Sequence, residues 1–278
     1  DFAVYHGDST VVTKGIPDNS IHYSIFSPPF DSLYTYSNSD RDMGNSAKGE
    51  FVKTGPQPWA SNINVEIVDA KFIDCDKDGD LDLLTISGGN EFSANSKELQ
   101  DRLYLNDGKG GFTKAKDALP SMLNSGGCIA ANDFDKDGDI DLFIGGRLTP
   151  RKYPHATDSH LLENVGGKFI EASEKKAPEL KNLGMVTAAS WTDYNNDGFE
   201  DLIVVGEWMP VTLFMQSETG TFKKETIANS EGWYYEVKTS DMDNDGDSDI
   251  IVGNLGLNYK YKATEKEPFE VHSYDFDN

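Results

Sequence analysis

The sequence predicts an all-β fold, a partial β-propeller of about four blades preceded by a short unrelated N-terminal segment. Two observations support this prediction. An acidic nine-residue loop, D-x-D-x-D-G-x-x-D with asparagine at the third position in one copy, occurs four times, and each copy leads into a short apolar run. The segments between the loops also repeat, with a strand, a glycine-containing turn and a returning strand in each. Repeated units of this size and strand content are typical of propeller blades.

The four loops begin at Asp74, Asp133, Asp193 and Asp241, so that their starts are 59, 60 and 48 residues apart. Each has glycine at its sixth position, where a sharp turn is needed, and aspartate at its ninth. A fifth copy is indicated by the sequence DFDN, which begins at residue 275. The regular recurrence indicates a structural module.

The loops are candidate calcium sites because oxygen ligands at positions 1, 3, 5, 7 and 9 suit a hard cation, with position 7 donating its backbone carbonyl. Magnesium fits less well, since it keeps its bound waters. The candidate ligands are Asp74, Asp76, Asp78, Asp80 and Asp82; Asp133, Asp135, Asp137, Asp139 and Asp141; Asp193, Asn195, Asp197, Phe199 and Asp201; and Asp241, Asp243, Asp245, Asp247 and Asp249. About four Ca²⁺ ions are therefore expected.

A helix-loop-helix calcium site would need a bidentate glutamate at loop position 12. That position is Thr85, Ile144, Val204 and Val252 in the four copies. The residues after each ninth aspartate are β-branched, aliphatic or aromatic, which predicts short buried strands. Two carboxylates about 5 Å apart repel each other by roughly 3 kcal/mol at an effective dielectric of 20. A bound cation is the simplest compensation for so much charge beside a buried strand.

The segments 102–115, 160–172 and 211–225 each predict two strands joined by a glycine turn. In each segment the returning strand carries a phenylalanine, which is Phe112, Phe169 or Phe222. Added to the strands that flank each loop, these pairs give about four strands per unit.

Residues 58–278 resemble the FG-GAP/VCBS repeat family of calcium-loop propellers, in the loops and in phrases such as DRLYLNDGKGGF, LFIGGRLTP and VGNLGLN. The resemblance implies a calcium-stabilised, non-catalytic scaffold that is secreted or on the bacterial cell surface and binds an extracellular protein or glycan ligand. The third loop departs from the pattern, with Asn195 at position 3 and Phe199 at position 7. Asparagine still offers an oxygen, so this departure affects only the expected affinity.

The composition is strongly acidic, with a formal net charge of −23. The four loops hold 19 of the 48 acidic residues and only two basic ones, Lys77 and Lys136. Four calcium ions would leave the surface acidic, which argues against nucleic acid or an anionic membrane as a partner. No apolar run is long enough to span a membrane. Cys75, the second residue of the first loop, is expected to point outward.

The first fifty residues follow a different pattern. Ser27, Pro28, Pro29 and Phe30 follow an apolar strand, and with the surrounding phrases they resemble the catalytic motif of phage-type DNA methyltransferases that modify the exocyclic amine of adenine or cytosine. By that resemblance Ser27 and the Pro28 carbonyl would bind the amine and Phe30 would stack on the flipped base. The rest of the chain offers no glycine-rich loop for S-adenosylmethionine. We therefore expect an orphaned fragment at 1–50 and the repeats at 51–278.

Three functions follow from these patterns. The favoured one is a calcium-dependent extracellular scaffold for adhesion or ligand binding. The alternatives are a DNA methyltransferase fragment using S-adenosylmethionine and an accessory domain of a secreted carbohydrate-active enzyme. Four blades also leave open sheet edges, which predicts self-association.

Overall fold

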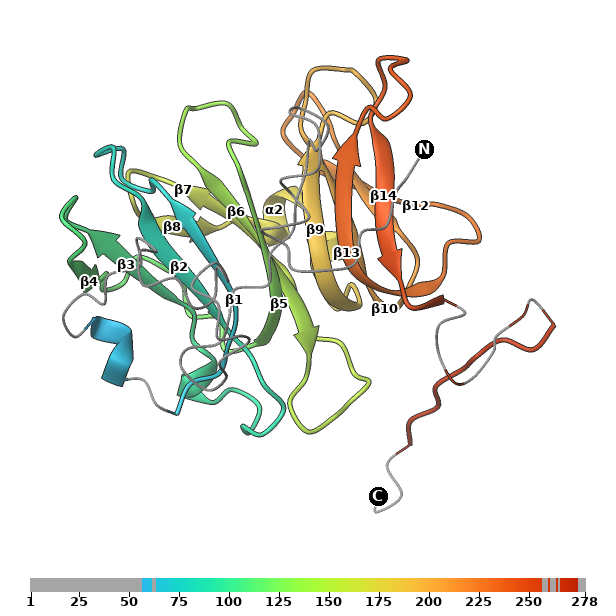
Figure 1. Cartoon of the computed structure of the whole chain (residues 1–278), viewed down its shortest axis with the longest axis horizontal. Coiled ribbons are helices and arrows are strands. Elements are labelled where there is room, and N and C mark those ends of the chain that lie inside the picture. Colours follow the sequence, from blue (N-terminus) through green and yellow to red (C-terminus); the bar gives the residue numbers. More distant parts are fainter. Residues whose placement is uncertain (1–56, 62–63, 257–259, 261–263, 265, 275–278) are drawn as a thin grey trace, which may run out of the picture. The chain divides into compact units, whose positions relative to one another are not determined.

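The computed structural model describes residues 57–61, 64–256, 260, 264 and 266–274. The Ser27–Phe30 motif, the segment 1–50 and the start of a fifth loop at 275 lie outside the described residues. The regular secondary structure of the described part is mostly antiparallel β-sheet, with a few short helices (Figure 1).

Three four-stranded units follow one another along the chain, each an antiparallel meander in sequence order. The first unit comprises β1 (Ile67–Ile73), β2 (Asp82–Ser87), β3 (Arg102–Asn106) and β4 (Phe112–Lys114). The second comprises β5 (Ser125–Asn132), β6 (Asp141–Leu148), β7 (His160–Asn164) and β8 (Phe169–Glu171). The third comprises β9 (Met185–Thr192), β10 (Asp201–Met209), β11 (Thr212–Gln216) and β12 (Phe222–Thr226).

A two-stranded hairpin follows the third unit and is formed by β13 (Gly232–Ser240) and β14 (Asp249–Asn254). The start of β13 also pairs with the end of β10, so that the hairpin and the third unit share one six-stranded sheet. Short helices connect or flank the strands: η2 (Pro58–Ser61), η3 (Lys97–Leu99), α2 (Ser173–Lys176) and η4 (Pro178–Leu180). Within the described ranges, none of the helices has the length and apolar character needed to cross a bilayer.

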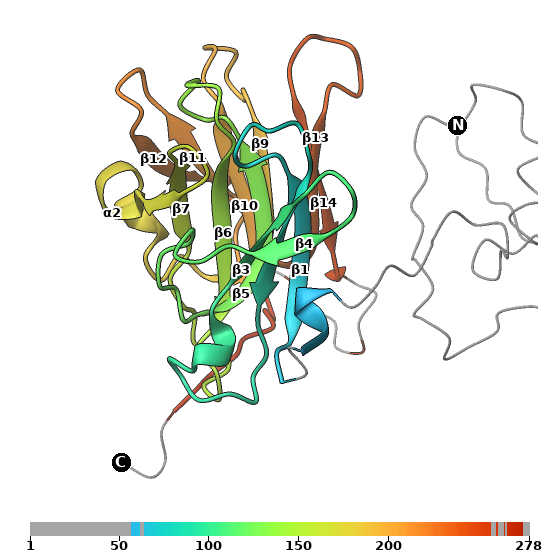
Figure 2. The same ribbon diagram turned by 90° about the vertical axis from the view of Figure 1, so that its left-hand side faces the viewer.

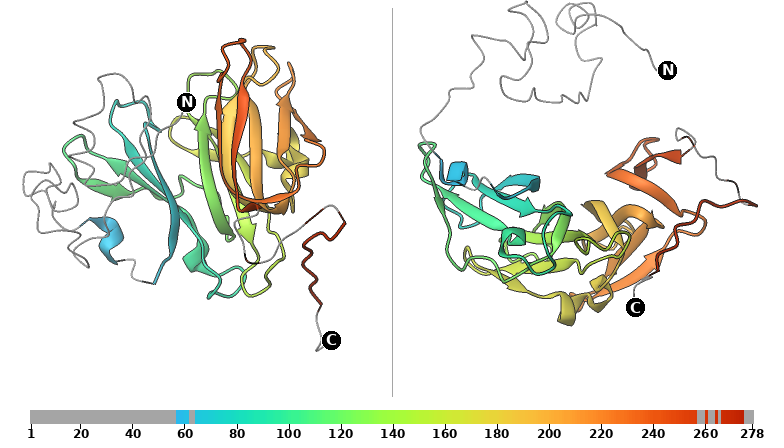
Figure 3. Two further views of the ribbon diagram at one scale, coloured as in Figure 1. Left: turned by 45° about the vertical axis from the view of Figure 1, so that its right-hand side comes forward. Right: turned by 90° about the horizontal axis from the view of Figure 1, so that it is seen from below.

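The first strands of successive units lie beside one another, β1 against β5, β5 against β9 and β9 against β13 (Figure 3). The backbones of β5 and β9 approach closely at Gly127 of β5, where an added Cβ would lie 2.1 Å from the carbonyl oxygen of Val186 in β9. Neighbouring first strands and outward-running meanders are the geometry of propeller blades.

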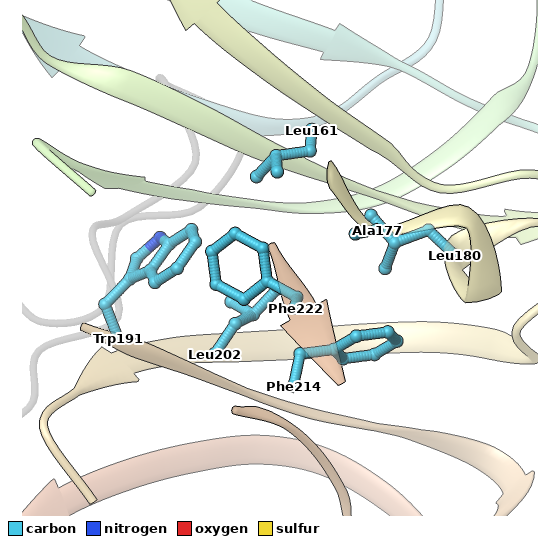
Figure 4. Close-up of a pocket in the computed structure, with 7 residues that line it drawn as sticks. All are labelled: Leu161, Ala177, Leu180, Trp191, Leu202, Phe214 and Phe222. Atoms are coloured by element: carbon cyan, nitrogen blue, oxygen red, sulfur yellow. The ribbon is translucent and has the colours of Figure 1, made fainter. Parts of the chain in front are cut away.

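The second strands of the second and third units, β6 and β10, are the most buried, because neighbouring elements pack on both of their faces. All residues of β6 except Arg147, and all of β10 except Trp208, are buried. Between the second and third units a hydrophobic cluster includes Phe134, Trp191 and Phe222. The Phe134 and Trp191 rings stack with centroids 5.7 Å apart. Figure 4 shows Trp191 and Phe222 converging with aliphatic neighbours from both units.

The structure confirms the prediction of an all-β, propeller-type fold with strand pairs in 102–115, 160–172 and 211–225. Phe112, Phe169 and Phe222 each begin the returning strand. The number of blades stays a prediction, because the described residues hold three complete units and a hairpin. The expected outward position of Cys75 is wrong: its side chain is fully buried in a cluster with residues of β6 and β7.

Candidate metal-binding loops

The four acidic loops occupy equivalent places in the fold. They connect β1 to β2, β5 to β6, β9 to β10 and β13 to β14. Figure 2 shows these connections gathered at the same end of the strands, the upper end in that view. The sequence repeat is therefore also a repeat in space.

All four loops share one local backbone geometry. The amide of the glycine at position 6 donates to the Oδ2 atom of the first aspartate over 3.1, 2.9, 2.8 and 3.0 Å in chain order. The amide at position 7 donates to Oδ1 of the aspartate at position 5 over 2.8–3.0 Å. Position 4 has a left-handed backbone in every copy, with φ between 57° and 62°. These turns give all four loops the same backbone path.

The aspartate at position 9 closes each loop. In the first three loops its Oδ2 atom accepts the amide of position 2, and its Oδ1 atom accepts the amide of the last residue of the third strand. Those last residues are Asn106, Asn164 and Gln216. In the fourth loop Asp249 accepts the amide of Met242 over 2.9 Å. The ninth aspartate thus ties the loop to its own sheet.

Three of the loops bring acidic oxygens close enough to share one metal ion. The sets are Asp74, Asp76 and Asp78; Asp133, Asp135 and Asp141; and Asp241, Asp243 and Asp245, each with one oxygen per residue within 4.8 Å of the others. In the third loop Asn195 contributes a neutral oxygen in place of the second carboxylate. The Oδ1 atoms of Asp74 and Asp133 are buried without a hydrogen-bond partner. Because an unpartnered buried oxygen is costly, these two atoms fit a bound cation.

The carboxylates disturb each other's ionisation. Burial raises the pKa of Asp141 to about 7, and the nearby carboxylates of Asp135 and Asp137 act in the same direction. Burial followed by repulsion from neighbouring aspartates also raises the pKa of Asp76 and Asp135. A divalent cation would reverse this effect, since it favours the ionised form of each ligand.

Comparison with known families matches residues 74–144 and 193–252 to the FG-GAP-like repeat. The chain carries FG-GAP-like repeats. Each match begins at the first aspartate of one loop and ends at position 12 of the next loop, so that all four loops lie within the matched ranges. No curated protein matches the chain.

The side chain at position 7 of these FG-GAP-like repeats contacts the preceding loop. Asp139 pairs with Lys77 of the first loop over 2.5 Å, and Asp247 accepts a hydrogen bond from Asn196 of the third loop over 2.6 Å. Lys136 of the second loop lies over the ring of Phe199, 5.4 Å from its centroid. Position 7 was predicted as a ligand through its backbone carbonyl, and the side-chain contacts leave that carbonyl available.

Sequence analysis missed the residues that join one FG-GAP-like repeat to the next. The side-chain amide of Asn164 donates to the carbonyl of Cys75 over 2.8 Å, and that of Gln216 donates to the carbonyl of Phe134 over 3.0 Å. Both carbonyls belong to position 2 of the preceding loop. The signal in the sequence is an Asn or Gln at the end of each third strand, in LYLN, LLEN and LFMQ.

Proposed function

We propose that the FG-GAP-like repeats form a calcium-binding, non-catalytic scaffold that acts in adhesion or ligand binding outside a bacterial cell. The observation that carries the proposal is the common geometry of the four loops, in which crowded carboxylates include two buried oxygens with no other partner. In this proposal about four Ca²⁺ ions are held by positions 1, 3, 5 and 9 and by the carbonyl of position 7. The repeats make up residues 51–278, and residues 1–50 form a separate segment.

An extracellular place suits this chemistry. Extracellular calcium modules bind the ion at roughly 10⁻⁴ to 10⁻³ M, a range that favours occupancy outside cells. The net charge of −23 requires cations if the loops are to pack against buried strands. Each bound ion then crosslinks the two innermost strands of a unit, β1 to β2 for example. The ligand of such a scaffold is an extracellular protein or a glycan.

Thermal unfolding with and without calcium tests the proposal. At ten times the dissociation constant each site contributes about 1.4 kcal/mol, so four sites contribute roughly 6 kcal/mol. For a fold of this size that corresponds to a fall in Tm of roughly 10–20 °C when EGTA replaces calcium. Magnesium at the same concentration should restore little of the loss. A melting curve that EGTA leaves unchanged contradicts the proposal.

Single substitutions test whether the calcium-dependent stabilisation comes from the loops themselves. Asp133→Asn weakens a ligand with a buried, unpartnered oxygen, and it should lower both calcium stoichiometry by calorimetry and the calcium-dependent gain in Tm. Asp117→Asn makes the same change of charge at an exposed position outside the loops and serves as the matched control. Equal effects of the two variants would mean that only net charge, and no specific site, matters.

Carbohydrate binding is a second candidate function, favoured by an aromatic cluster at the strand ends far from the loops. The rings of Trp208 and Trp233 lie 5.0 Å apart, and Tyr235 continues the series at 6.4 Å from Trp233. Trp208 donates its Nε1–H to the hydroxyl of Tyr153, which in turn donates to buried Glu207. Tyr153 and Tyr235 are 44% and 49% exposed. The exposed tyrosine faces are suited to stacking against sugar rings, whereas the Trp208 ring is already stacked against Phe269, with centroids 5.3 Å apart.

The backbone at Trp208 adds to this argument. Its φ is +60°, a conformation that is strained for a bulky residue, and such strain is concentrated at functional sites. Seven residues after the ninth loop aspartate, the same place holds Gly89 in the first unit and Gly256 after the hairpin, both with positive φ. The third unit therefore keeps an indole where glycine fits the backbone better.

Retention on immobilised neutral polysaccharides in millimolar calcium tests this second candidate. Trp208→Gly should abolish retention. Glycine relieves the backbone strain, but the change also removes the ring contacts with Trp233 and Phe269, so Tm is measured alongside retention to show that the variant is folded. Tyr153→Phe keeps the ring, loses the hydroxyl that orients Trp208, and should weaken retention partially. If the unsubstituted protein is not retained on any polysaccharide, the carbohydrate function is rejected and the scaffold function is unaffected.

A further inference from the structure

Each acidic loop contacts the next one through a repeated pair of positions. Position 4 of one loop meets position 7 of the following loop in all three junctions, Lys77 with Asp139, Lys136 with Phe199 and Asn196 with Asp247. Lys136 also donates to the carbonyl of Gly198, the residue before Phe199. The four loops therefore form a continuous row in which each contacts its neighbours.

The chemistry of each pair is matched. Lysine meets aspartate in the first junction, lysine meets an aromatic face in the second and asparagine meets aspartate in the third. Phe199, which departs from the aspartate found at position 7 in the other loops, is thus accounted for by a cation–π contact. A ligand that binds metal through its backbone carbonyl can carry any side chain. The side chain at position 7 can therefore be one that fits position 4 of the preceding loop.

The backbone at position 4 supports a role for its side chain. Lys77, Lys136, Asn196 and Asn244 all have φ near +60°. This conformation costs a lysine roughly 1–2 kcal/mol, whereas glycine adopts it freely. A lysine at such a position is favoured where its side chain has a partner, and here the partner belongs to the next loop.

A second set of contacts joins the same loops to the same neighbours. Asn164 of the second unit binds the carbonyl of Cys75 in the first loop, and Gln216 of the third unit binds the carbonyl of Phe134 in the second loop. The backbone amides of Asn164 and Gln216 also bind the ninth aspartates of their own loops. One residue therefore contacts two successive loops, which gives a direct mechanical connection between them.

We propose that the metal sites are coupled to their nearest neighbours, so that a calcium ion in one loop raises the calcium affinity of the adjacent loops, with the position 4–position 7 pair as the coupling element. This inference rests on the proposed calcium function. A bound ion orders the backbone of its loop and so fixes the position 4 side chain. The next loop then loses less conformational freedom when it binds its own ion. Because coupling is reciprocal, the following loop favours binding in the preceding loop by the same factor.

Site-resolved calcium titration of the whole chain tests the proposal. The amides of Gly79, Gly138, Gly198 and Gly246 each donate to the first aspartate of their own loop, so their NMR resonances report that loop. Asp193→Asn disables the third loop. We expect the calcium midpoint of the fourth loop, followed at Gly246, to rise about five-fold, and that of the first loop to stay unchanged.

A double-mutant cycle assigns the coupling to the pair. Asn196→Ala removes the contact with Asp247, and in this background Asp193→Asn should no longer move the midpoint of the fourth loop. Asn244→Ala is the matched control. It changes the same residue type at the same loop position and with a similar backbone conformation, but Asn244 has no following loop to contact among the described residues. It should leave the midpoints of the first three loops unchanged. If Asp193→Asn impairs folding, Asp197→Asn replaces it as a milder change in the same loop.

The outcomes are distinct. If the glycine resonances titrate but Asp193→Asn does not shift the fourth loop, the sites are independent and the coupling is refuted. If the shift persists in full with Asn196→Ala, the position 4–position 7 pair does not carry it and the proposal is refuted in that form. If none of the four glycine amides responds to millimolar calcium, the calcium function itself is wrong and the coupling is rejected with it.

Discussion

The first three loops and the fourth have the same local fold in very different surroundings. All four keep the hydrogen bond from the position 6 glycine to the first aspartate and the left-handed residue at position 4. The ninth aspartate is 1%, 1% and 0% exposed in the first three loops, whereas Asp249 is exposed. Nine residues therefore suffice to shape a loop, and burial of the loop depends on other strands.

Two contacts make the difference. In the complete units the third strand supplies the amide that binds the second oxygen of the ninth aspartate, and the hairpin β13–β14 has no third strand among the described residues. In the first three loops the residue at position 2 packs into the unit or hairpin that follows, as Phe134 does against Trp191. Its counterpart in the fourth loop, Met242, is 65% exposed. A loop is thus completed by its own third strand and by its successor.

Replacing the residue at position 2 should give the largest contrast between the two regions. Phe134→Ala removes a ring that is 1% exposed and contacts Trp191 and Phe222, and it should cost about 3–5 kcal/mol of unfolding free energy. Met242→Ala at the same position of the fourth loop should cost about 0.5 kcal/mol or less. Urea unfolding in saturating calcium measures both, and similar losses would show that the fourth loop is as well packed as the others.

The amide clamp between units should give a smaller contrast. Asn164 and Asn106 both end a third strand, but Asn164 binds the carbonyl of Cys75 in the preceding loop while Asn106 binds the carbonyl of Leu81 in its own exposed loop. Asn164→Ala leaves a buried carbonyl without a partner and should cost about 1–3 kcal/mol more than Asn106→Ala. Equal losses in urea unfolding would mean that the contact between units adds no stability.

The other end of the third strand provides the most selective test. The residue just before the third strand accepts a hydrogen bond from a backbone amide of the second strand. In the first unit Asp101 accepts from the amide of Ser87, and in the second unit Ser159 accepts from the amide of Gly146. Burial raises the pKa of Asp101 to about 8. Between about pH 4 and pH 8 the folded state therefore holds a proton that the unfolded state has released, so this group makes stability fall as pH rises, by at most about 1.4 kcal/mol per pH unit.

Asp101→Asn keeps the acceptor for Ser87 and removes the titration. We expect its unfolding free energy, measured in saturating calcium, to decline less steeply than that of the unsubstituted protein between pH 5 and pH 8. Asp117→Asn, at an exposed position, should follow the unsubstituted protein across the same range. Parallel pH profiles for all three proteins would show that Asp101 is ionised in the folded state.

The sequence by itself determined the repeated loop, the strand that follows it and the strand pair that completes a unit. These features depend on local rules: hydrogen bonds between carboxylates and amides two to five residues apart, a glycine at the turn, and the apolar pattern of short strands. Only the tertiary structure decided how the units are joined. The side chain of Cys75 is buried between units, Asn164 binds the preceding loop and Lys136 pairs with Phe199. The last two contacts join residues 89 and 63 positions apart, and no local pattern encodes them. They arise because packing the first strands side by side brings one end of every unit against the next.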